Sequence, residues 1–165
     1  MTISLTAEER APLIDEYEAG PARLRAAWNR MPAEARQWRP DPSAWSAHEI
    51  VVHCADSETY AATRIRLLVA ESAPRIVGYD QDGWAKRFDY HAQSPEQALD
   101  TVAAVRRGTL PIVRALDEAA WVKMGTHTES GPYGACDWLR SYAAHVTNHA
   151  KQIERNLEAF VATRP

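Results

Sequence analysis

The chain has 165 residues, of which 45% are hydrophobic and 25% are charged, as is usual for a soluble globular domain. The net charge is −3, and no block of lysine and arginine suggests a surface for nucleic acid. No apolar run approaches the roughly 18 residues of a membrane span, and the acidic N-terminal stretch does not resemble a secretory signal. We therefore expect one domain over residues 1–165, with neither a nucleic-acid nor a membrane partner.

The two cysteines do not suggest a disulfide framework. Cys54 and Cys136 are far apart in the sequence and form no CxxC pair. Such isolated cysteines are typical of reduced thiols in the cytoplasm, so we expect a cytoplasmic protein.

The first predicted helix begins after Thr6 and runs toward Met31. Thr6 and Glu9 fit a capping box, in which a hydroxyl and a carboxylate three residues apart bond each other's backbone N–H. Gly20-Pro21 interrupts the pattern, so we expect a kink or a break there. The following loop carries three prolines, Pro32, Pro40 and Pro42.

The second predicted helix begins at Ser46 and continues to about Ala70. Ser46 and Glu49 form another capping box. An apolar stripe at helical spacing marks the face toward the core. It consists of Ile50, Cys54, Ala61, Ile65 and Leu68.

The central part of the chain predicts a short helix at about 82–90 and a third long helix. The long helix begins at Ser94-Pro95, where a cap precedes a tolerated proline. We expect it to reach about Trp121 with a kink at Pro111. Residues 125–134 are rich in glycine and are predicted to form a loop.

The fourth predicted helix runs from about Ala135 to Val161. Its apolar stripe consists of Leu139, Ala143, Val146, Ala150, Ile153, Leu157 and Phe160. Four long helices separated by loops predict an all-α four-helix bundle.

A polar stripe lies beside the apolar one on the fourth helix. His145 and His149 are four residues apart and therefore project from one face. Polar groups that border a core must find partners. The full stripe is Tyr142, His145, His149, Gln152 and Asn156.

A third histidine would complete a metal site. His53 lies within the second helix, on a stripe that is again polar: Glu49, His53, Asp56 and Tyr60. In a bundle these two stripes can face each other. Three imidazoles with an open position are typical of a catalytic metal site, and imidazole suits Zn and Ni alike.

Simpler alternatives remain open at this point. Histidines four apart also occur by chance, as core residues that bind nothing. Two other metal classes fit less well: a zincin needs glutamate where Val146 stands, and a di-iron bundle needs ExxH motifs that are absent from the sequence.

Several segments together resemble one known family. Residues 45–53 read Trp-Ser-x-x-Glu-x-x-x-His, and His145-x-x-x-His149 is followed by Gln152-Ile153. Asp82-Gly83-Trp84 and Gly125-Thr126-His127 match further recurrent features. In this order and separation they resemble the DinB-like superfamily, also called DinB/YfiT-like metalloenzymes.

The resemblance implies a four-helix bundle with a divalent metal, Zn or Ni, held by His53, His145 and His149. Characterised relatives include thiol-dependent S-transferases and a mycothiol-dependent maleylpyruvate isomerase, so a low-molecular-weight thiol is an implied second cofactor. Homodimers are common in the family. One departure is Gly134-Ala135-Cys136 before Asp137, where relatives often have a Ser or Thr cap.

Five further residues are candidates for orienting a ligand or lining the pocket: Glu49, Asp56, Tyr60, Trp84 and Tyr142. Each has an ordinary alternative, namely helix capping for Glu49, a solvated or ion-paired face for Asp56, and packing for the three aromatics. His48 is predicted to be exposed.

Three functions fit the sequence. The first is a metal-dependent enzyme acting on a small molecule, either by thiol transfer or by hydrolysis. The second is a metal-binding or stress-response bundle without turnover. The third is a structural bundle whose histidines bind nothing.

Overall fold

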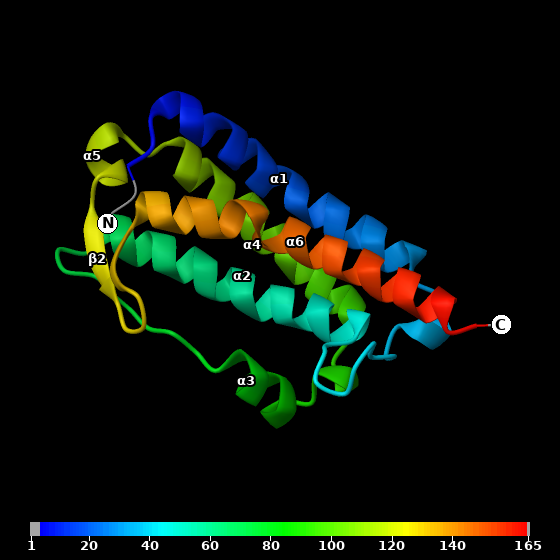
Figure 1. Cartoon of the computed structure of the whole chain (residues 1–165). Helices are drawn as coiled ribbons and strands as arrows, with labels where there is room; N and C mark the ends of the chain where they lie inside the picture. Colours follow the sequence, from blue (N-terminus) through cyan, green and yellow to red (C-terminus); the bar gives the residue numbers. More distant parts are fainter. Residues whose placement is uncertain (1–3, 165) are drawn as a thin grey trace.

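The computed structural model describes residues 4–164 and contains four long helices that lie side by side (Figure 1). The predicted four-helix bundle is confirmed. The long helices are α1 (Ala7–Arg30), α2 (Ala47–Ala70), α4 (Pro95–Arg114) and α6 (Ala135–Ala162). None of the helices described is both long and apolar enough to cross a membrane.

Helices that are consecutive in sequence are not always neighbours in the bundle. α1 packs along α4 and α6, and α2 packs along the same two helices, whereas α1 and α2 scarcely touch. The segment 31–46, which includes the 3₁₀ helix η1 (Ala33–Ala35), connects these two diagonal helices (Figure 1). The polar stripes of α2 and α6 therefore lie on adjacent helices.

The predicted helix starts are confirmed. Both capping boxes are complete, at Thr6 with Glu9 and at Ser46 with Glu49. Ser94 caps α4, with a proline directly after it. These bonds satisfy backbone N–H groups that have no partner inside a helix.

The expected interruption at Gly20-Pro21 was wrong in that α1 runs unbroken through it. A proline inside a helix leaves the carbonyl four residues earlier without its N–H partner. Here that carbonyl belongs to Tyr17, and it accepts a hydrogen bond of 2.6 Å from Nη1 of Arg106. A side chain from α4 thus replaces the lost bond.

The region between the second and fourth long helices departs from the prediction. α4 ends at Arg114 instead of near Trp121, because Asp117 caps a separate short helix by accepting from the N–H of Ala120 at 2.8 Å. The short elements are α3 (Gln81–Arg87), the 3₁₀ helix η2 (Tyr90–Ala92) and α5 (Glu118–Trp121).

The predicted loop at 125–134 forms a β-hairpin instead. Strands β2 (Met124–His127) and β3 (Gly131–Gly134) pair antiparallel, and β1 (Arg75–Ile76) adds a short parallel strand. Gly131 has a φ of 78°, a backbone conformation that would be strained in a residue with a side chain. Gly131, one of the glycines that suggested a loop, permits the tight reversal between the two strands.

The apolar core has two parts, one toward each end of the bundle. One contains Leu24, Ile50 and Val102, and the other contains Ile65 and Trp138. Between them, the helices carry polar or small residues. This middle layer contains Gly20 on α1, Glu58 on α2, Arg106 on α4 and His145 on α6.

Candidate metal centre

Three histidines from two helices converge in the bundle. His53 lies in α2, and His145 and His149 lie one turn apart in α6. One ligand atom from each lies within 4.8 Å of the other two, and Nε2 of His53 is 3.4 Å from Nε2 of His145. Within residues 4–164 no other group of His, Cys, Asp or Glu side chains gathers in this way.

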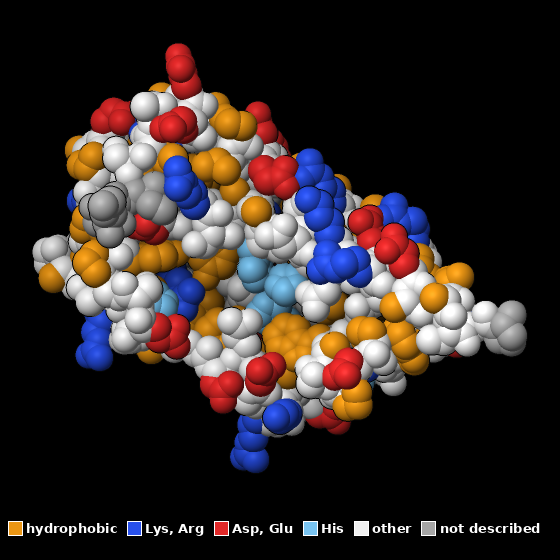
Figure 2. All heavy atoms as spheres, in the orientation of Figure 1, with side chains coloured by type: hydrophobic (Ala, Val, Ile, Leu, Met, Phe, Trp, Pro, Cys, Tyr) orange, Lys and Arg blue, Asp and Glu red, His pale blue; other side chains and the backbone are white. Residues whose placement is uncertain are grey.

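Figure 2 shows a group of histidine side chains in a hollow on this face, with apolar side chains beside it. His53 is buried, whereas the side chain of His145 is 21% exposed. Trp45 packs on His53 with ring centroids 4.6 Å apart, and the hydroxyl of Ser57 is 3.4 Å from Nε2 of His145. A small solute can therefore reach the imidazoles from one side.

The Nδ1 atoms of the three imidazoles have different environments. Nδ1 of His149 pairs with Oε1 of Gln152 at 2.9 Å. Nδ1 of His145 faces Oε1 of Glu58 at 3.5 Å, which is too long for a standard hydrogen bond. Nδ1 of His53 has no hydrogen-bond partner among residues 4–164. When Nδ1 of His149 donates to Gln152, its Nε2 keeps a lone pair for a ligand.

This geometry fits a divalent metal. Tetrahedral Zn with bonds of about 2.0–2.1 Å places its nitrogen ligands about 3.3 Å apart, close to the 3.4 Å between His53 and His145. The two Nε2 atoms can share a hydrogen bond only when one ring carries its proton there, whereas a metal ion between them would take the lone pairs of both. The third ring, that of His149, lies slightly farther away and completes the set of ligands after a small movement toward the other two.

Burial keeps two of the rings neutral, as metal ligation requires. Desolvation, followed by the proximity of the other two histidines, lowers the pKa of His53 to about 2. Desolvation and the neighbouring His145 lower the pKa of His149 to about 4. Neither ring needs to lose a proton to bind a metal at neutral pH.

Tyr142 lies beside the histidine cluster. Its ring centroid is 5.8 Å from that of His145, and its hydroxyl accepts a hydrogen bond of 2.7 Å from Nη1 of Arg64. Arg64 also donates to the carbonyl of Val77 and lines a hollow of about 340 Å³ next to α2. Arg64 and Tyr142 thus form a polar contact between α2 and α6 beside His145.

Tyr60 and Trp84 belong to an aromatic cluster. Tyr79 lies between them, with its ring centroid 4.8 Å from Tyr60 and 4.6 Å from Trp84. Phe88 continues the cluster at 5.7 Å from Trp84. The cluster holds α3 against α2, and within residues 4–164 none of its rings pairs with the rings of the three histidines.

Asp56 has a structural partner of its own. Its carboxylate accepts a hydrogen bond from the hydroxyl of Tyr90, which is buried in η2. This contact also raises the pKa of Tyr90, after the larger effect of burial. Asp56 therefore anchors η2 to α2.

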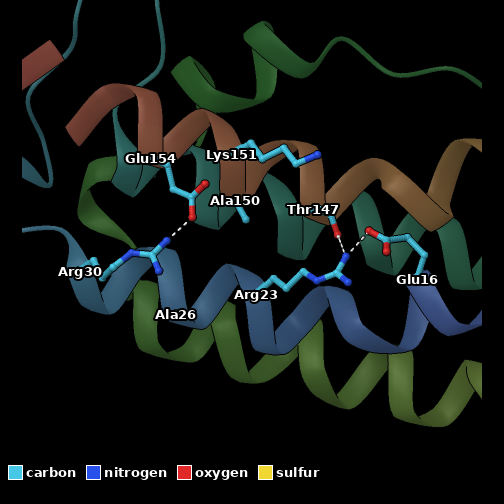
Figure 3. A pocket seen from close by; sticks show the side chains of 8 residues that line it. All are labelled: Glu16, Arg23, Ala26, Arg30, Thr147, Ala150, Lys151 and Glu154. Atoms are coloured by element: carbon cyan, nitrogen blue, oxygen red, sulfur yellow. Dashed lines mark hydrogen bonds and ion pairs between the residues drawn. The ribbon is translucent and has the colours of Figure 1, made fainter. Parts of the chain in front are cut away.

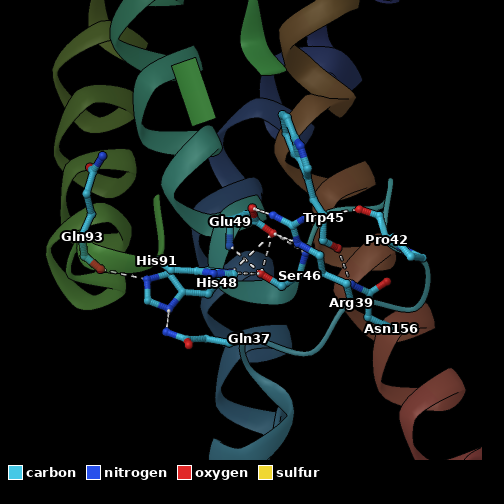
Figure 4. Close-up of polar contacts among 10 residues, drawn as sticks. All are labelled: Gln37, Arg39, Pro42, Trp45, Ser46, His48, Glu49, His91, Gln93 and Asn156. Atoms are coloured by element: carbon cyan, nitrogen blue, oxygen red, sulfur yellow. Dashed lines mark hydrogen bonds and ion pairs between the residues drawn. The ribbon is translucent and has the colours of Figure 1, made fainter. Parts of the chain in front are cut away.

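Glu49 lies in a polar network at the start of α2 (Figure 4). Its carboxylate accepts from Nε of Arg39 at 3.0 Å and from the backbone N–H of Ser46 at 2.9 Å. Burial alone would raise its pKa, but these hydrogen bonds hold the pKa below the usual value. His91 bonds the hydroxyl of Ser46 at 2.8 Å, so the network ties three segments together.

The prediction that His48 is exposed was wrong. It is 7% exposed, and its Nε2 lies 2.8 Å from the carbonyl oxygen of Gln93 (Figure 4). The loops 31–46 and 88–94 cover this part of α2. Sequence periodicity describes one helix and does not reveal such a cover.

Sequence reasoning missed the ion pair behind His145. Glu58 and Arg106 are 0% and 2% exposed as side chains and pair at 2.7 Å. The signal was present: Glu58 fills the gap in the apolar stripe between Cys54 and Ala61, and Arg106 follows Val102 at helical spacing. A charge inside an apolar stripe indicates a buried pair.

A second hollow of about 630 Å³ lies between α1 and α6 (Figure 3). Most of its charges pair with each other, Arg30 with Glu154 and Arg23 with Glu16. Arg23 also donates to the hydroxyl of Thr147 at 3.3 Å. Such exposed pairs are typical of a solvated surface, and none of the three histidines lines this hollow.

Comparison with known proteins identifies the family. The profile of the DinB superfamily matches residues 16–153. The chain belongs to the DinB superfamily. This confirms the resemblance inferred from residues 45–53 and from the histidine pair of α6.

Relatives of this DinB superfamily protein carry names that refer to metal. The Bacillus subtilis protein "Putative metal-dependent hydrolase YfiT" is 23% identical over 158 residues, which cover 91% of this chain and 89% of the relative. An Oceanobacillus iheyensis protein with the same type of name is 28% identical over 109 residues, which cover 66% of this chain and 63% of the relative. That match thus spans less than two thirds of the relative.

The solved structure of Bacillus subtilis YfiT has the same fold. It superposes with a TM-score of 0.87 at 22% identity, over 94% of this chain and 90% of the other. It is described as having an unusual four-helix bundle topology.

Proposed function

We propose that this protein is a metal-dependent hydrolase of small molecules, with one divalent ion held by His53, His145 and His149. The convergence of three imidazoles within 4.8 Å, in a hollow open on one side, carries the proposal. The names of relatives that match most of the chain point in the same direction. Zn and Ni both suit this ligand set.

The residues around the cluster would have different roles in binding the substrate and excluding water. When bound, a divalent ion supplies Lewis acidity, which generates a nucleophile near neutral pH. The hydroxyl of Ser57, 3.4 Å from Nε2 of His145, can bond a polar atom of the substrate. Arg64 and Tyr142 offer further donors, and Trp45 shields His53 from water.

No protein thiol competes for this role among the described residues. Cys54 and Cys136 are both buried, and burial, together with the nearby Glu58, raises the pKa of Cys54 well above its usual value. Thiol transfer, the second candidate, would need a low-molecular-weight thiol from solution. The family resemblance favours that candidate, and the same metal site would serve it.

Metal content tests the site. We expect about one Zn or Ni per chain in untagged wild-type protein by plasma mass spectrometry, and a loss of that metal in His149→Ala. His91→Ala, a histidine outside the cluster, is the matched control and should retain the metal. Wild-type protein that takes up neither metal would overturn the proposal.

Turnover separates hydrolysis from its alternatives. Metal-loaded protein would be assayed with a panel of esters and amides, and with electrophiles in the presence and absence of thiols. We expect ester or amide cleavage that needs the metal but no thiol. Turnover only with thiol would favour transfer, and metal binding without any turnover would favour a non-catalytic bundle.

A further inference from the structure

A buried carboxylate stands behind one of the three histidines. Oε1 of Glu58 faces Nδ1 of His145 at 3.5 Å, on the side of the ring away from His53. Glu58 is 0% exposed, so water cannot solvate its charge. A fully buried carboxylate needs charged or hydrogen-bonding partners.

Arg106 supplies those partners and belongs to a larger brace. Its Nε and Nη2 donate to the two oxygens of Glu58 at 2.9 and 2.7 Å. Nη1 donates to the carbonyl of Tyr17, and Nη2 also donates to the carbonyl of Tyr142 at 2.8 Å. One side chain of α4 thereby contacts α1, α2 and α6.

Two residues of α1 accommodate the guanidinium. A Cβ at Gly20 would lie 2.5 Å from Nη1 of Arg106, so only glycine leaves this space. Pro21 frees the carbonyl of Tyr17, which Arg106 then occupies. The Gly20-Pro21 pair is thus part of the Arg106 site.

We propose that Glu58 and Arg106 form a positioning pair that sets the ring orientation and tautomer of His145 for metal binding. The pair holds a negative oxygen toward Nδ1, which favours the N–H at Nδ1 and leaves the lone pair of Nε2 facing His53. Carboxylates behind metal-bound histidines commonly act in this way. The inference rests on the proposed metal site.

The three imidazoles are supported unequally, which makes His145 distinctive. His149 has a neutral amide behind it, His53 has no partner, and His145 has a charged pair that connects all four long helices. Because Arg106 holds Glu58 by two bonds, the carboxylate cannot turn away from the ring. His145 is therefore the ligand whose orientation depends on the bundle as a whole.

Replacing the whole pair tests the proposal without leaving a buried charge. Glu58→Leu with Arg106→Met substitutes apolar side chains of similar size, a change that folded proteins often tolerate. We expect the Kd for Zn²⁺, measured by chelator competition, to rise about 10- to 100-fold. Glu49→Leu with Arg39→Met removes the other ion pair of a buried α2 glutamate, which is more exposed on its arginine side, and should leave this Kd nearly unchanged.

The tautomer of His145 gives a readout without metal or activity. Long-range ¹H–¹⁵N spectra of metal-free wild-type protein should show the proton on Nδ1, and the double variant should show a mixture. A brace with a purely structural role would lower the Tm but leave both the tautomer and the Kd unchanged, which would overturn the proposal.

Two further outcomes are kept distinct. If the double variant does not fold, Gly20→Ala displaces Arg106 without removing a charge, and we expect a weaker Zn²⁺ affinity in the same direction; an unchanged affinity and tautomer would count against the pair. If wild-type protein shows the Nδ1 tautomer but takes up no Zn²⁺, the proposed function fails while the orienting role of Glu58 stands.

Discussion

Two glutamates on α2 show how similar chemistry serves different purposes. Glu49 and Glu58 are both buried, and each pairs with one arginine. Arg39, the partner of Glu49, is 42% exposed and only ten residues away in the chain. Arg106, the partner of Glu58, is 2% exposed and comes from a different long helix.

The difference lies in what each pair holds. Glu49 closes the first turn of α2 and gathers the loops around it (Figure 4). Glu58 stands between the two parts of the apolar core and faces His145. Glu49 keeps its hydrogen bonds to Ser46 when the exposed Arg39 is lost, whereas the buried charge of Glu58 depends on Arg106.

The largest difference should follow from removing each arginine. Arg106→Leu leaves Glu58 as an uncompensated buried charge, and we expect a loss of about 3–5 kcal/mol in the free energy of unfolding. Arg39→Leu should cost about 1 kcal/mol or less, because solvent screens an exposed partner. Urea unfolding of both variants measures this, and equal losses would remove the distinction between the two pairs.

Acid should lower the free energy of unfolding through the two buried rings His53 and His149. The ordinary histidine pKa is 6.5, and the folded values are about 2 for His53 and about 4 for His149. Well above pH 6.5 the rings are neutral in both the folded and the unfolded chain, so they do not make the stability depend on pH. Below it the unfolded chain takes up protons that the folded chain excludes, so stability falls as the pH drops toward 4.

The expected loss for metal-free protein is about 3 kcal/mol between pH 6.5 and 5 for the two rings together. Urea unfolding at several pH values measures it. His48 also has a lowered pKa and contributes in the same direction. His149→Leu should flatten the dependence, and an unchanged slope in that variant would show that His149 is not excluded from protonation.

Two glycines test the space around Arg106. Gly20→Ala places a methyl group 2.5 Å from Nη1 of Arg106, and overpacking of this kind costs about 1–3 kcal/mol. Gly108 in α4 has open space around it, so Gly108→Ala should stabilise the protein by up to about 1 kcal/mol through helix propensity. Thermal unfolding compares the two, and a stabilising Gly20→Ala would show that Arg106 moves freely.

The smallest effect concerns the Glu49 end of α2. Ser46→Ala removes a capping hydroxyl that accepts from the N–H of Glu49 at 3.2 Å, and we expect a loss of about 1 kcal/mol. The Kd for Zn²⁺ should not change, since the hydrogen bonds of Ser46 and Glu49 involve none of the three histidines. A clear change in metal affinity, measured by chelator competition, would show that the capping network at Ser46 and Glu49 influences the metal site.

Local sequence patterns located the four long helices and the two polar stripes that carry the histidines. A capping box spans three residues, and an apolar stripe repeats within one helix, so both can be recognised without knowledge of the fold. The spacing of His145 and His149 follows the same periodicity. The polar stripe of the second helix suggested His53 as the third ligand, the family resemblance implied the same residue, and the structure brings the three together.

The remaining features arise from contacts between distant segments. The partner of Glu58 is 48 residues away, and the carbonyl freed by Pro21 finds its donor 89 residues away. From the sequence, Gly20-Pro21 therefore suggests an interruption, and residues 125–134 suggest a loop. The free energy of a buried charge or a freed carbonyl depends on what the other helices bring to it, and that was decided by the packing of the bundle.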